Sequence, residues 1–243
     1  MKTPAPAAVL FDMDGTLVDT EVLWWETARE VAAGLGHRLS DADAPEVVGR
    51  AVADTAAHLI GVTGQDPSAA PGTAADRAVA LERTAAELTD SFFRKVDAGA
   101  PLRPGAAALL ASLEAAGVPF ALVSASPRSV VDAVVAGSLA GVGFAFTLSA
   151  EDTVRTKPHP DPYRAAAERF AADPAACVAV EDSPDGTASA DAAGCAVLVV
   201  PSLLRVAPGR ARTFARSLEE VDLRVLSDCL RRPDPEIRSS KPA

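Results

Sequence analysis

Cysteine is rare in this sequence: the 243 residues include three, Cys177, Cys195 and Cys229, at widely separated positions. Their spacing fits neither a disulfide framework nor a tetrahedral zinc site. Cys177 and Cys195 lie within apolar segments, as cysteines that fill a hydrophobic core commonly do. The sequence therefore argues against a protein stabilised by disulfides or by zinc.

An excess of positive charge is also missing. Lys and Arg total 23 whereas Asp and Glu total 33, so the formal net charge is −10. Nucleic acids are bound mainly through basic surfaces that contact phosphates, so this composition argues against a nucleic-acid partner. A small phosphorylated substrate is not excluded, because a few local cations and a metal ion are enough to hold one.

Long apolar runs are absent as well. The apolar segment near the start is interrupted by Asp12 and Asp14, so it predicts neither a signal peptide nor a membrane span. We expect no membrane partner and a cytoplasmic location. The 49% hydrophobic and 23% charged residues are typical of a globular protein, and the length allows a core domain with a smaller companion.

A pair of carboxylates follows the first apolar segment. Residues 7–11 predict a buried parallel strand, Asp12 comes directly after it, and Asp14 follows before a turn at Gly15 and Thr16. Two carboxylates placed in this way can converge on one hard cation, which would also screen their mutual repulsion. The alternative is an acidic pair that serves only turn formation or solubility.

The next part of the chain predicts helices without strands. It is rich in alanine, and the Gly and Pro residues of 62–73 indicate a loop within it. An insertion of this kind after the first strand would form a separate helical cap, for which we predict residues 20–97. The helices predicted there are 21–34, 44–49, 54–61 and 75–96.

The remaining chain alternates between strands and helices, which predicts an α/β fold: a Rossmann-like parallel sheet covered on both faces. We assign residues 1–19 and 98–230 to this core, expect an edge element of undetermined form at 214–226, and expect a flexible tail at 231–243. Strand carboxyl ends would then share one sheet edge, where ligands bind. The predicted strands are 120–123, 144–148, 177–180 and 196–200, and the helices are 106–116, 128–136, 161–172 and 187–193.

A serine follows the second predicted strand. The Ser124 hydroxyl, together with backbone N–H groups of the turn at Ala125 and Ser126, can hold phosphate oxygens. The alternative is helix capping, which the Ser126-Pro127 pair also offers.

One lysine lies in a loop stiffened by three prolines. In that loop, residues 155–163, Lys157 is followed by Pro158, and an ammonium group fixed at the site could offset charge on carboxylate and phosphoryl oxygens. A solvated surface lysine is the alternative. We interpret the neighbouring His159 as structural, and His37 and His58 have no candidate partners in the sequence.

A second acidic cluster follows the strand predicted at 177–180. Asp182, with Asp12 and the backbone carbonyl of Asp14, would complete an oxygen-rich site of the kind that Mg²⁺ prefers. Glu181 could bind the ion directly or through water, and Asp185 could hold those waters. The alternative is an acidic helix N-terminus, which we favour for Asp185.

These four motifs, taken together and in this order, resemble those of the haloacid dehalogenase-like phosphohydrolases. The match is tightest to the subgroup with a helical cap after the first motif, which includes sugar-phosphate phosphatases, phosphoglycolate phosphatases and β-phosphoglucomutases. The resemblance implies that Asp12 is the nucleophile, Asp14 the general acid and base, and Mg²⁺ the cofactor. It implies metal ligation by Asp12, Asp14, Glu181 and Asp182, and substrate or phosphate binding by Thr16, Glu21, Ser124, Ala125 and Lys157.

The resemblance leaves several activities open. An Asp at position 14 argues against a dehalogenase, and the retained acidic and lysine residues argue against a non-catalytic binding protein. A phosphomutase would carry Gly-x-x-Arg in its cap, whereas Arg50 here directly follows Gly49. We therefore predict a phosphatase, acting as a monomer or weak homodimer on a small phosphorylated metabolite.

Two adjacent tryptophans bear on the substrate. The segment from Glu21 to Trp25 resembles that of sugar- and hexitol-phosphate phosphatases more than that of the phosphoglycolate enzymes. Adjacent residues on a helix point in different directions, so we expect only one of Trp24 and Trp25 to pack in the core. The alternative places Trp24 or Glu21 near a substrate entrance.

Overall fold

The computed structural model describes residues 5–48, 50, 52–63, 74–202 and 204–231. The chain divides into two compact units: the first comprises the described parts of Met1–Leu17, Leu102–Val131 and Gly141–Ala243, and the second those of Val18–Pro101 and Asp132–Ala140. Most of the predicted loop 62–73 and of the predicted tail lies outside the described residues, and so does Gly49.

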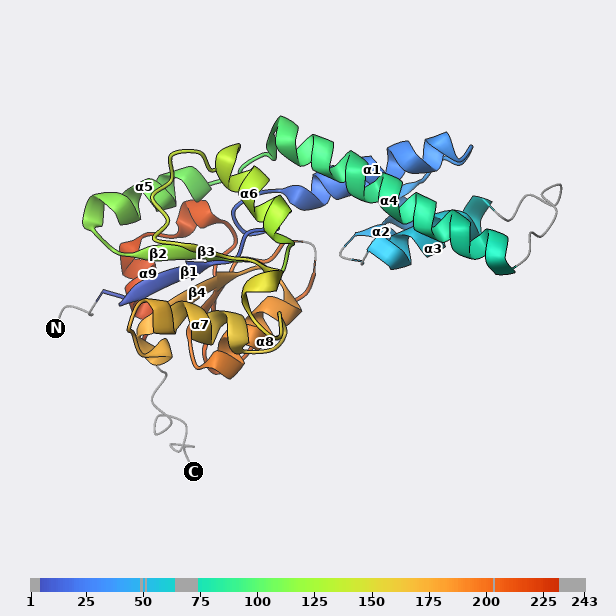
Figure 1. Cartoon of the computed structure of the whole chain (residues 1–243). Coiled ribbons are helices and arrows are strands. Elements are labelled where there is room, and N and C mark those ends of the chain that lie inside the picture. Colours follow the sequence, from blue (N-terminus) through green and yellow to red (C-terminus); the bar gives the residue numbers. More distant parts are fainter. Residues whose placement is uncertain (1–4, 49, 51, 64–73, 203, 232–243) are drawn as a thin grey trace, which may run out of the picture. The chain divides into compact units, whose positions relative to one another are not determined.

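The first unit is built on a six-stranded parallel sheet with the strand order β3-β2-β1-β4-β5-β6 (Figure 1). β1 therefore lies in the middle, between β2 and β4, and Leu10 pairs with Ala121 on one side and with Ala179 on the other. All four residues of β1 are buried, as a continuous apolar strand in a parallel sheet requires. The strands are β1 (Ala8–Phe11), β2 (Phe120–Val123), β3 (Thr147–Leu148), β4 (Cys177–Glu181), β5 (Ala196–Val199) and β6 (Arg212–Phe214).

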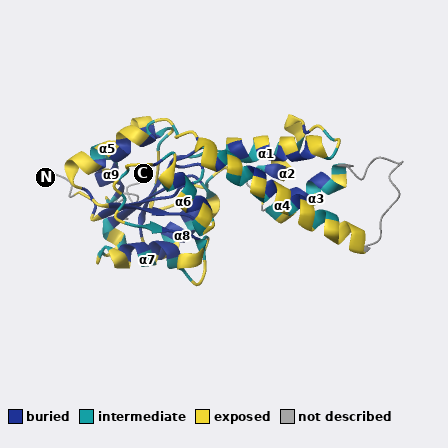
Figure 2. Cartoon of the chain, turned by 45° about the horizontal axis from the view of Figure 1, so that its top comes forward, coloured by how far each residue is buried: buried dark blue, intermediate teal, exposed yellow. Residues whose placement is uncertain are grey.

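Helices cover both faces of this sheet, which confirms the predicted α/β architecture. On one face, α7 (Asp161–Arg169) and α8 (Pro184–Ala193) pack against alternate strand residues and form one buried cluster with them. On the opposite face lie α5 (Ala106–Ala116) and α9 (Leu223–Cys229) (Figures 1 and 2). α6 (Arg128–Ala136) follows β2.

The second unit is helical. Its helices are α1 (Thr20–Gly34), α2 (Ala44–Val47), α3 (Val52–Thr63) and α4 (Ala74–Gly99), and all four helices predicted for this region are present, with ends that differ by a few residues. Apolar side chains of these helices face one another and form a separate core, visible as the buried stripe between the helices in Figure 2. Short 3₁₀ helices complete the chain: Asp41–Asp43, Ala150–Asp152, Pro174–Ala176 and Leu218–Glu220.

Both tryptophans belong to this helical core, so the expectation that only one packs there is wrong. Trp24 and Trp25 are half-buried against the same apolar cluster. The Trp24 indole N–H donates to the carbonyl of Val47 at 2.9 Å, and its ring meets Phe92 edge-on at 5.4 Å. Trp24 thus ties α1 to α2 and α4.

Three predicted boundaries in the first unit are wrong by three residues, each for a local reason, whereas one boundary each of β1, β4 and β5 differs by a single residue. β3 begins at Thr147, not 144, because the Phe144 N–H turns back to the carbonyl of Val142. α7 ends at Arg169, not 172, because Ala171 adopts a left-handed conformation with φ 49°. α8 begins three residues earlier than predicted: the Ser183 side chain accepts from the Gly186 N–H, and a proline follows that cap.

The edge element predicted at 214–226 consists of several pieces. β6 pairs with β5, the 3₁₀ helix Leu218–Glu220 follows, and α9 closes the described chain. Asp222 caps α9, accepting from the Val225 N–H at 2.8 Å. This cap fixes where the chain changes from an extended to a helical conformation.

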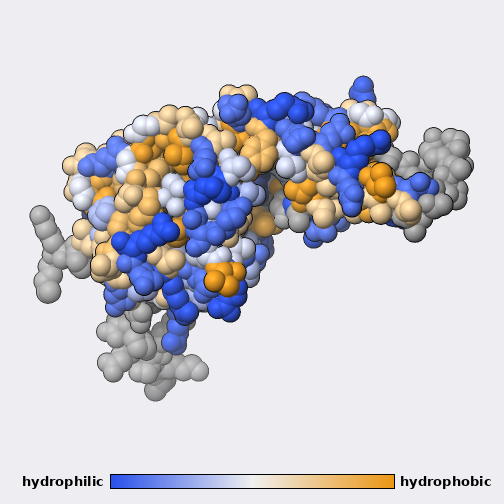
Figure 3. All heavy atoms as spheres, viewed as in Figure 1, coloured by the Kyte–Doolittle hydropathy of each residue, from blue (hydrophilic) through white to orange (hydrophobic). Residues whose placement is uncertain are grey.

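The surface of both units mixes hydrophilic and hydrophobic residues, as the face drawn in Figure 3 shows. The large apolar residues that are exposed in the described part of the chain are Val22 and Val79 in the second unit, and Leu102, Val154, Leu204 and Phe214 in the first. Among the described helices, none combines the length and the apolar character that a membrane span requires. The three cysteines are buried and free, as predicted for Cys177 and Cys195.

Candidate active site

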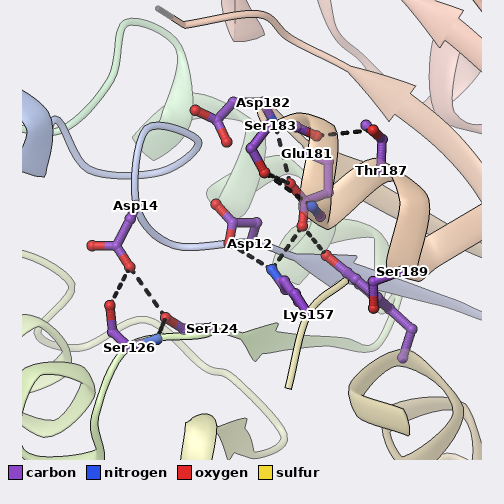
Figure 4. Close-up of polar contacts among 12 residues, drawn as sticks. Asp12, Asp14, Ser124, Ser126, Lys157, Glu181, Asp182, Ser183, Thr187 and Ser189 are labelled. Atoms are coloured by element: carbon purple, nitrogen blue, oxygen red, sulfur yellow. Dashed lines mark hydrogen bonds and ion pairs between the residues drawn. The ribbon is translucent and has the colours of Figure 1, made fainter. Parts of the chain in front are cut away.

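The carboxyl ends of β1, β2 and β4 bring the predicted site residues together. Asp12 follows β1 directly, and its N–H donates to the carbonyl of Val180 in β4 at 3.0 Å. Ser124 follows β2, Glu181 ends β4, and Asp182 comes next. Because these strands are neighbours and parallel, residues far apart in sequence converge at one edge of the sheet, as Figure 4 shows.

Lys157 lies between two of the carboxylates. Its ammonium group is 2.7 Å from Oδ1 of Asp12 and 2.7 Å from Oε1 of Glu181. The lysine side chain is 4% exposed, which rules out the solvated surface lysine that its loop left as an alternative. Burial lowers the pKa of Lys157, but the two carboxylates outweigh burial and raise it overall, so the residue is a fixed cation.

Glu181 is held by four donors. Its Oε1 accepts from Lys157 and, at 2.6 Å, from the Tyr163 hydroxyl; its Oε2 accepts from the Asp182 N–H and the Ser183 hydroxyl, each at 3.2 Å. The Tyr163 ring also lies 5.1 Å from the lysine nitrogen. With both oxygens in use, the strongest role of Glu181 in this geometry is to orient Lys157. Its predicted role as a metal ligand stays a prediction.

Asp12 keeps one oxygen available. Lys157 takes Oδ1, whereas Oδ2 is buried and has no hydrogen-bond partner among the described residues. One oxygen each of Asp12, Glu181 and Asp182 lie within 4.8 Å of one another, so this buried group could hold a metal ion. Gly15 lets the loop after β1 approach this group of carboxylates, because a Cβ at position 15 would lie 2.1 Å from Oδ2 of Asp182.

The electrostatics of the group favour a bound cation. Burial raises the pKa of Asp12 to about 7; Lys157 opposes the rise, and the neighbouring Glu181 and Asp14 charges add to it. With Asp182 the site holds four carboxylates against one ammonium. A divalent cation would compensate this excess of negative charge and favour the ionised form of Asp12.

Asp14 is turned toward the loop after β2. Its Oδ2 accepts from the Ser124 hydroxyl at 3.1 Å and from the Ser126 hydroxyl at 2.7 Å (Figure 4). The Ser124 oxygen in turn accepts from the Ser126 N–H at 2.9 Å. Two hydroxyl groups therefore hold the second carboxylate of the first motif, on the side of the site away from Glu181.

The geometry assigns no specific role in the reaction to the other predicted site residues. Thr16 is 1% exposed, and its hydroxyl oxygen has no hydrogen-bond partner among the described residues. Ala125 is exposed in the turn between the two serines. Glu21 is half-buried in the first turn of α1, and it belongs to the second unit. Asp185 is exposed in the first turn of α8, where an acidic side chain suits the helix N-terminus.

His159 has structural contacts, as interpreted from the sequence. Its carbonyl accepts from the Ser189 hydroxyl at 2.5 Å, and its Nδ1 lies 2.9 Å from a carboxylate oxygen of Asp161. His58, which had no candidate partner in the sequence, lies 3.1 Å from Asp43 in the second unit. Neither histidine contacts the carboxylates of the site among the contacts that the structure describes.

Sequence reasoning missed two residues of the site, Tyr163 and Ser126. Tyr163 is the one tyrosine of the chain, and it lies six positions after Lys157 on the first turns of a helix whose buried face packs on the sheet. A lone buried aromatic with a polar end, close to a predicted cation, is a usable signal. The sequence offered the Ser126 backbone N–H for phosphate binding, with helix capping as the alternative, and only the fold shows that the Ser126 hydroxyl reaches Asp14.

Comparison with known proteins agrees with this geometry. The sequence model of the haloacid dehalogenase-like hydrolases matches residues 6–194. Hexitol phosphatase B of Escherichia coli K12 is 32% identical over 204 residues, 83% of this chain and 87% of that protein. Hexitol phosphatase A of the same strain is 35% identical over 202 residues, 79% and 81% of the two chains.

Among solved structures, CbbY from Rhodobacter sphaeroides in complex with phosphate is similar, with a TM-score of 0.66 and 28% identity, covering 88% of this chain and 96% of that one. The family match covers most of the chain and includes all four motifs at the sheet edge. The chain therefore belongs to the haloacid dehalogenase-like hydrolases and is a phosphoric monoester hydrolase.

Proposed function

We propose that this protein is a Mg²⁺-dependent phosphatase that hydrolyses a hexitol phosphate or a related sugar phosphate through an aspartyl-phosphate on Asp12. The observation that carries the proposal is the Asp12 carboxylate itself. One of its oxygens is fixed by Lys157, while the other is buried among carboxylates and lacks a partner in the described part of the chain. A carboxylate held in this way is poised to act as a nucleophile when a cation bound at the site keeps it ionised.

In the first step an Asp12 oxygen attacks phosphorus, and the bond between phosphorus and the leaving alkoxide breaks. Asp14 transfers a proton to the alkoxide and becomes a carboxylate. In the second step Asp14 takes a proton from water as that water attacks the aspartyl-phosphate, which releases phosphate and regenerates Asp12. Ser124 and Lys157 hold the phosphoryl oxygens and offset their charge during both steps.

The residues fit Mg²⁺. Asp12 and Asp182 would hold it with the backbone carbonyl of Asp14, because hard oxygen ligands around a partly hydrated ion suit this metal. Bound there, the ion would supply charge compensation for the phosphoryl oxygens and for the carboxylates.

We assign the helical second unit the role of a cap that selects the leaving group, with residues 20–97 as its extent. The relatives named hexitol phosphatase support a hexitol or sugar phosphate over phosphoglycolate. A substrate with one phosphate also suits the described part of the site, because Arg128, at the start of the helix after β2, is already paired with Asp152 and Thr147.

The test is phosphate release from a panel of hexitol phosphates, sugar phosphates, phosphoglycolate and nucleotides, with Mg²⁺ and with a chelator. We expect Mg²⁺-dependent release concentrated on hexitol or hexose phosphates. The panel includes β-glucose 1-phosphate with its product followed, because isomerisation without release would identify a mutase instead. Asp173→Asn, an exposed residue that caps a 3₁₀ helix, is the matched control and should retain activity.

A further inference from the structure

We propose that Ser126 is a positioning residue that fixes the acid and base carboxylate of Asp14 throughout the reaction, an inference that rests on the proposed function. The two side chains come from different strands: Asp14 follows β1, and Ser126 follows β2. Their oxygens are 2.7 Å apart, the shorter of the two hydroxyl contacts to Asp14.

The turn that carries Ser126 is held from two sides. The Ser126 N–H donates to the Ser124 side-chain oxygen at 2.9 Å, and the Ser126 carbonyl accepts from the Ala150 N–H at 3.0 Å. Arg128, two residues later, donates its backbone N–H to Glu151 at 2.9 Å and its guanidinium to Thr147 at 2.7 Å. These hydrogen bonds fix the loop that carries Ser126, so the Ser126 hydroxyl is held at a defined position beside Asp14.

Ser124 and Ser126 have different tasks in this arrangement. During phosphoryl transfer the Ser124 hydroxyl donates to a phosphoryl oxygen, so it can no longer donate to Asp14. Ser126 is then the hydroxyl that still holds Oδ2 of Asp14. Figure 4 shows both serines on the same oxygen of Asp14 and the other oxygen directed away from them.

This contact decides which oxygen of Asp14 carries the reacting proton. A hydroxyl that donates to Oδ2 makes that oxygen an acceptor, so a proton on Asp14 must be carried by Oδ1. As the oxygen–phosphorus bond to Asp12 forms and the phosphorus–alkoxide bond breaks, Oδ1 delivers its proton to the alkoxide. Without Ser126, Oδ2 loses this donor and Asp14 can carry its proton on either oxygen, so leaving-group protonation slows.

The dependence of kcat/KM on the leaving group separates the positioning role of Ser126 from a merely structural one. An alkyl phosphate needs a proton on its leaving oxygen, whereas p-nitrophenyl phosphate releases a stabilised phenolate without one. The ratio kcat/KM reports the first, phosphoryl-transfer step for both substrates. We expect Ser126→Ala to lower kcat/KM for a hexitol phosphate about 30-fold, part of the effect of a general acid, and to lower it for p-nitrophenyl phosphate by less than about threefold.

Ser126→Thr keeps the hydroxyl and should restore most of the difference between the two substrates, whereas Ser126→Val, of the same shape, should not. This pair also provides the test should the alanine variant fail to fold. Ser112→Ala is the matched control, because the Ser112 hydroxyl contacts only a backbone carbonyl of α5 among the described contacts.

An equal loss for both substrates, or no loss for either, would overturn the inference. The proposed function would survive that result, because it is judged by the dependence of phosphate release on Mg²⁺ and on Asp12. Absence of Mg²⁺-dependent phosphate release from the parent protein would instead count against the proposed function.

Discussion

Gly186 leaves the space that the Glu181 carboxylate occupies. A Cβ at position 186 would lie 1.9 Å from both carboxylate oxygens of Glu181, far inside contact distance. The side chain that orients Lys157 is therefore folded over the first turn of α8, where only a residue without a side chain leaves room for it.

Gly186→Ala should therefore cost activity although alanine normally favours a helix. The new methyl group would displace Glu181 and with it Lys157, and we expect at least about a 10-fold loss of kcat, since misplacement of a reacting group by an ångström can cost more than that. Gly61→Ala, at a helical glycine with nothing within 4 Å of its Cβ position, is the control and should stabilise the protein by up to about 1 kcal/mol. Equal activity of the two variants would contradict this account.

How far the sequence predicts the site depends on the kind of residue. Asp12, Ser124 and Asp182 follow apolar segments, and a parallel sheet brings strand ends together, so their convergence could be inferred before the fold was known. Lys157 was found through its stiff loop. Tyr163 and Ser126 could not be assigned in this way, because their roles depend on which side-chain atoms meet across strands.

The elements of the fold also divide into those whose bounds the sequence predicts and those that depend on tertiary contacts. β2 and α5, which ends before Gly117, were predicted at their observed bounds, and β1, β4 and β5 were predicted to within one residue. The errors lie where tertiary contacts decide: the end of α7 at a left-handed Ala171, and the packing of both Trp24 and Trp25 in one core. Such features leave no periodic pattern in the sequence.

Removing the buried ammonium should cost both stability and activity. Lys157→Met leaves Asp12 and Glu181 facing each other without compensation, and we expect a loss of about 3–5 kcal/mol in the free energy of unfolding. Phosphate release should fall by about two orders of magnitude or more, since an electrostatic contact to the transferring group is lost.

Lys95→Met is the control for this variant. Lys95 also contacts two carboxylates, Glu26 and Glu30, but these are largely exposed, so its loss should cost less than about 1 kcal/mol. Urea unfolding of the variants measures the difference. Similar losses for the two lysines would show that the ion group around Lys157 is not as buried as described.

Mg²⁺ should stabilise the protein more at pH 8 than at pH 5. Burial raises the pKa of Asp12 from 3.8 to about 7, so the folded state binds this proton more tightly than the unfolded state does. In the metal-free protein the stabilisation from this proton is complete below about pH 4 and is lost as the pH rises toward about 7. A cation that replaces the proton therefore has its largest effect above that range.

Thermal unfolding with and without Mg²⁺ at the two pH values measures this effect. Asp12→Asn lacks the titrating group, so its response to Mg²⁺ should be smaller and less dependent on pH. An equal increase in Tm at pH 5 and pH 8 for the parent protein would contradict the role assigned to Asp12.

The central claim, that Asp12 accepts the phosphoryl group, is tested most directly by trapping the covalent intermediate. The protein is mixed with a hexitol phosphate and Mg²⁺, quenched in acid within the first turnovers, reduced with borohydride and digested, and the peptide containing Asp12 is analysed by mass spectrometry. The account predicts conversion of Asp12 to the reduced residue, in the presence of Mg²⁺ and substrate together. An unmodified Asp12 peptide during active turnover, or modification at another carboxylate, would contradict it.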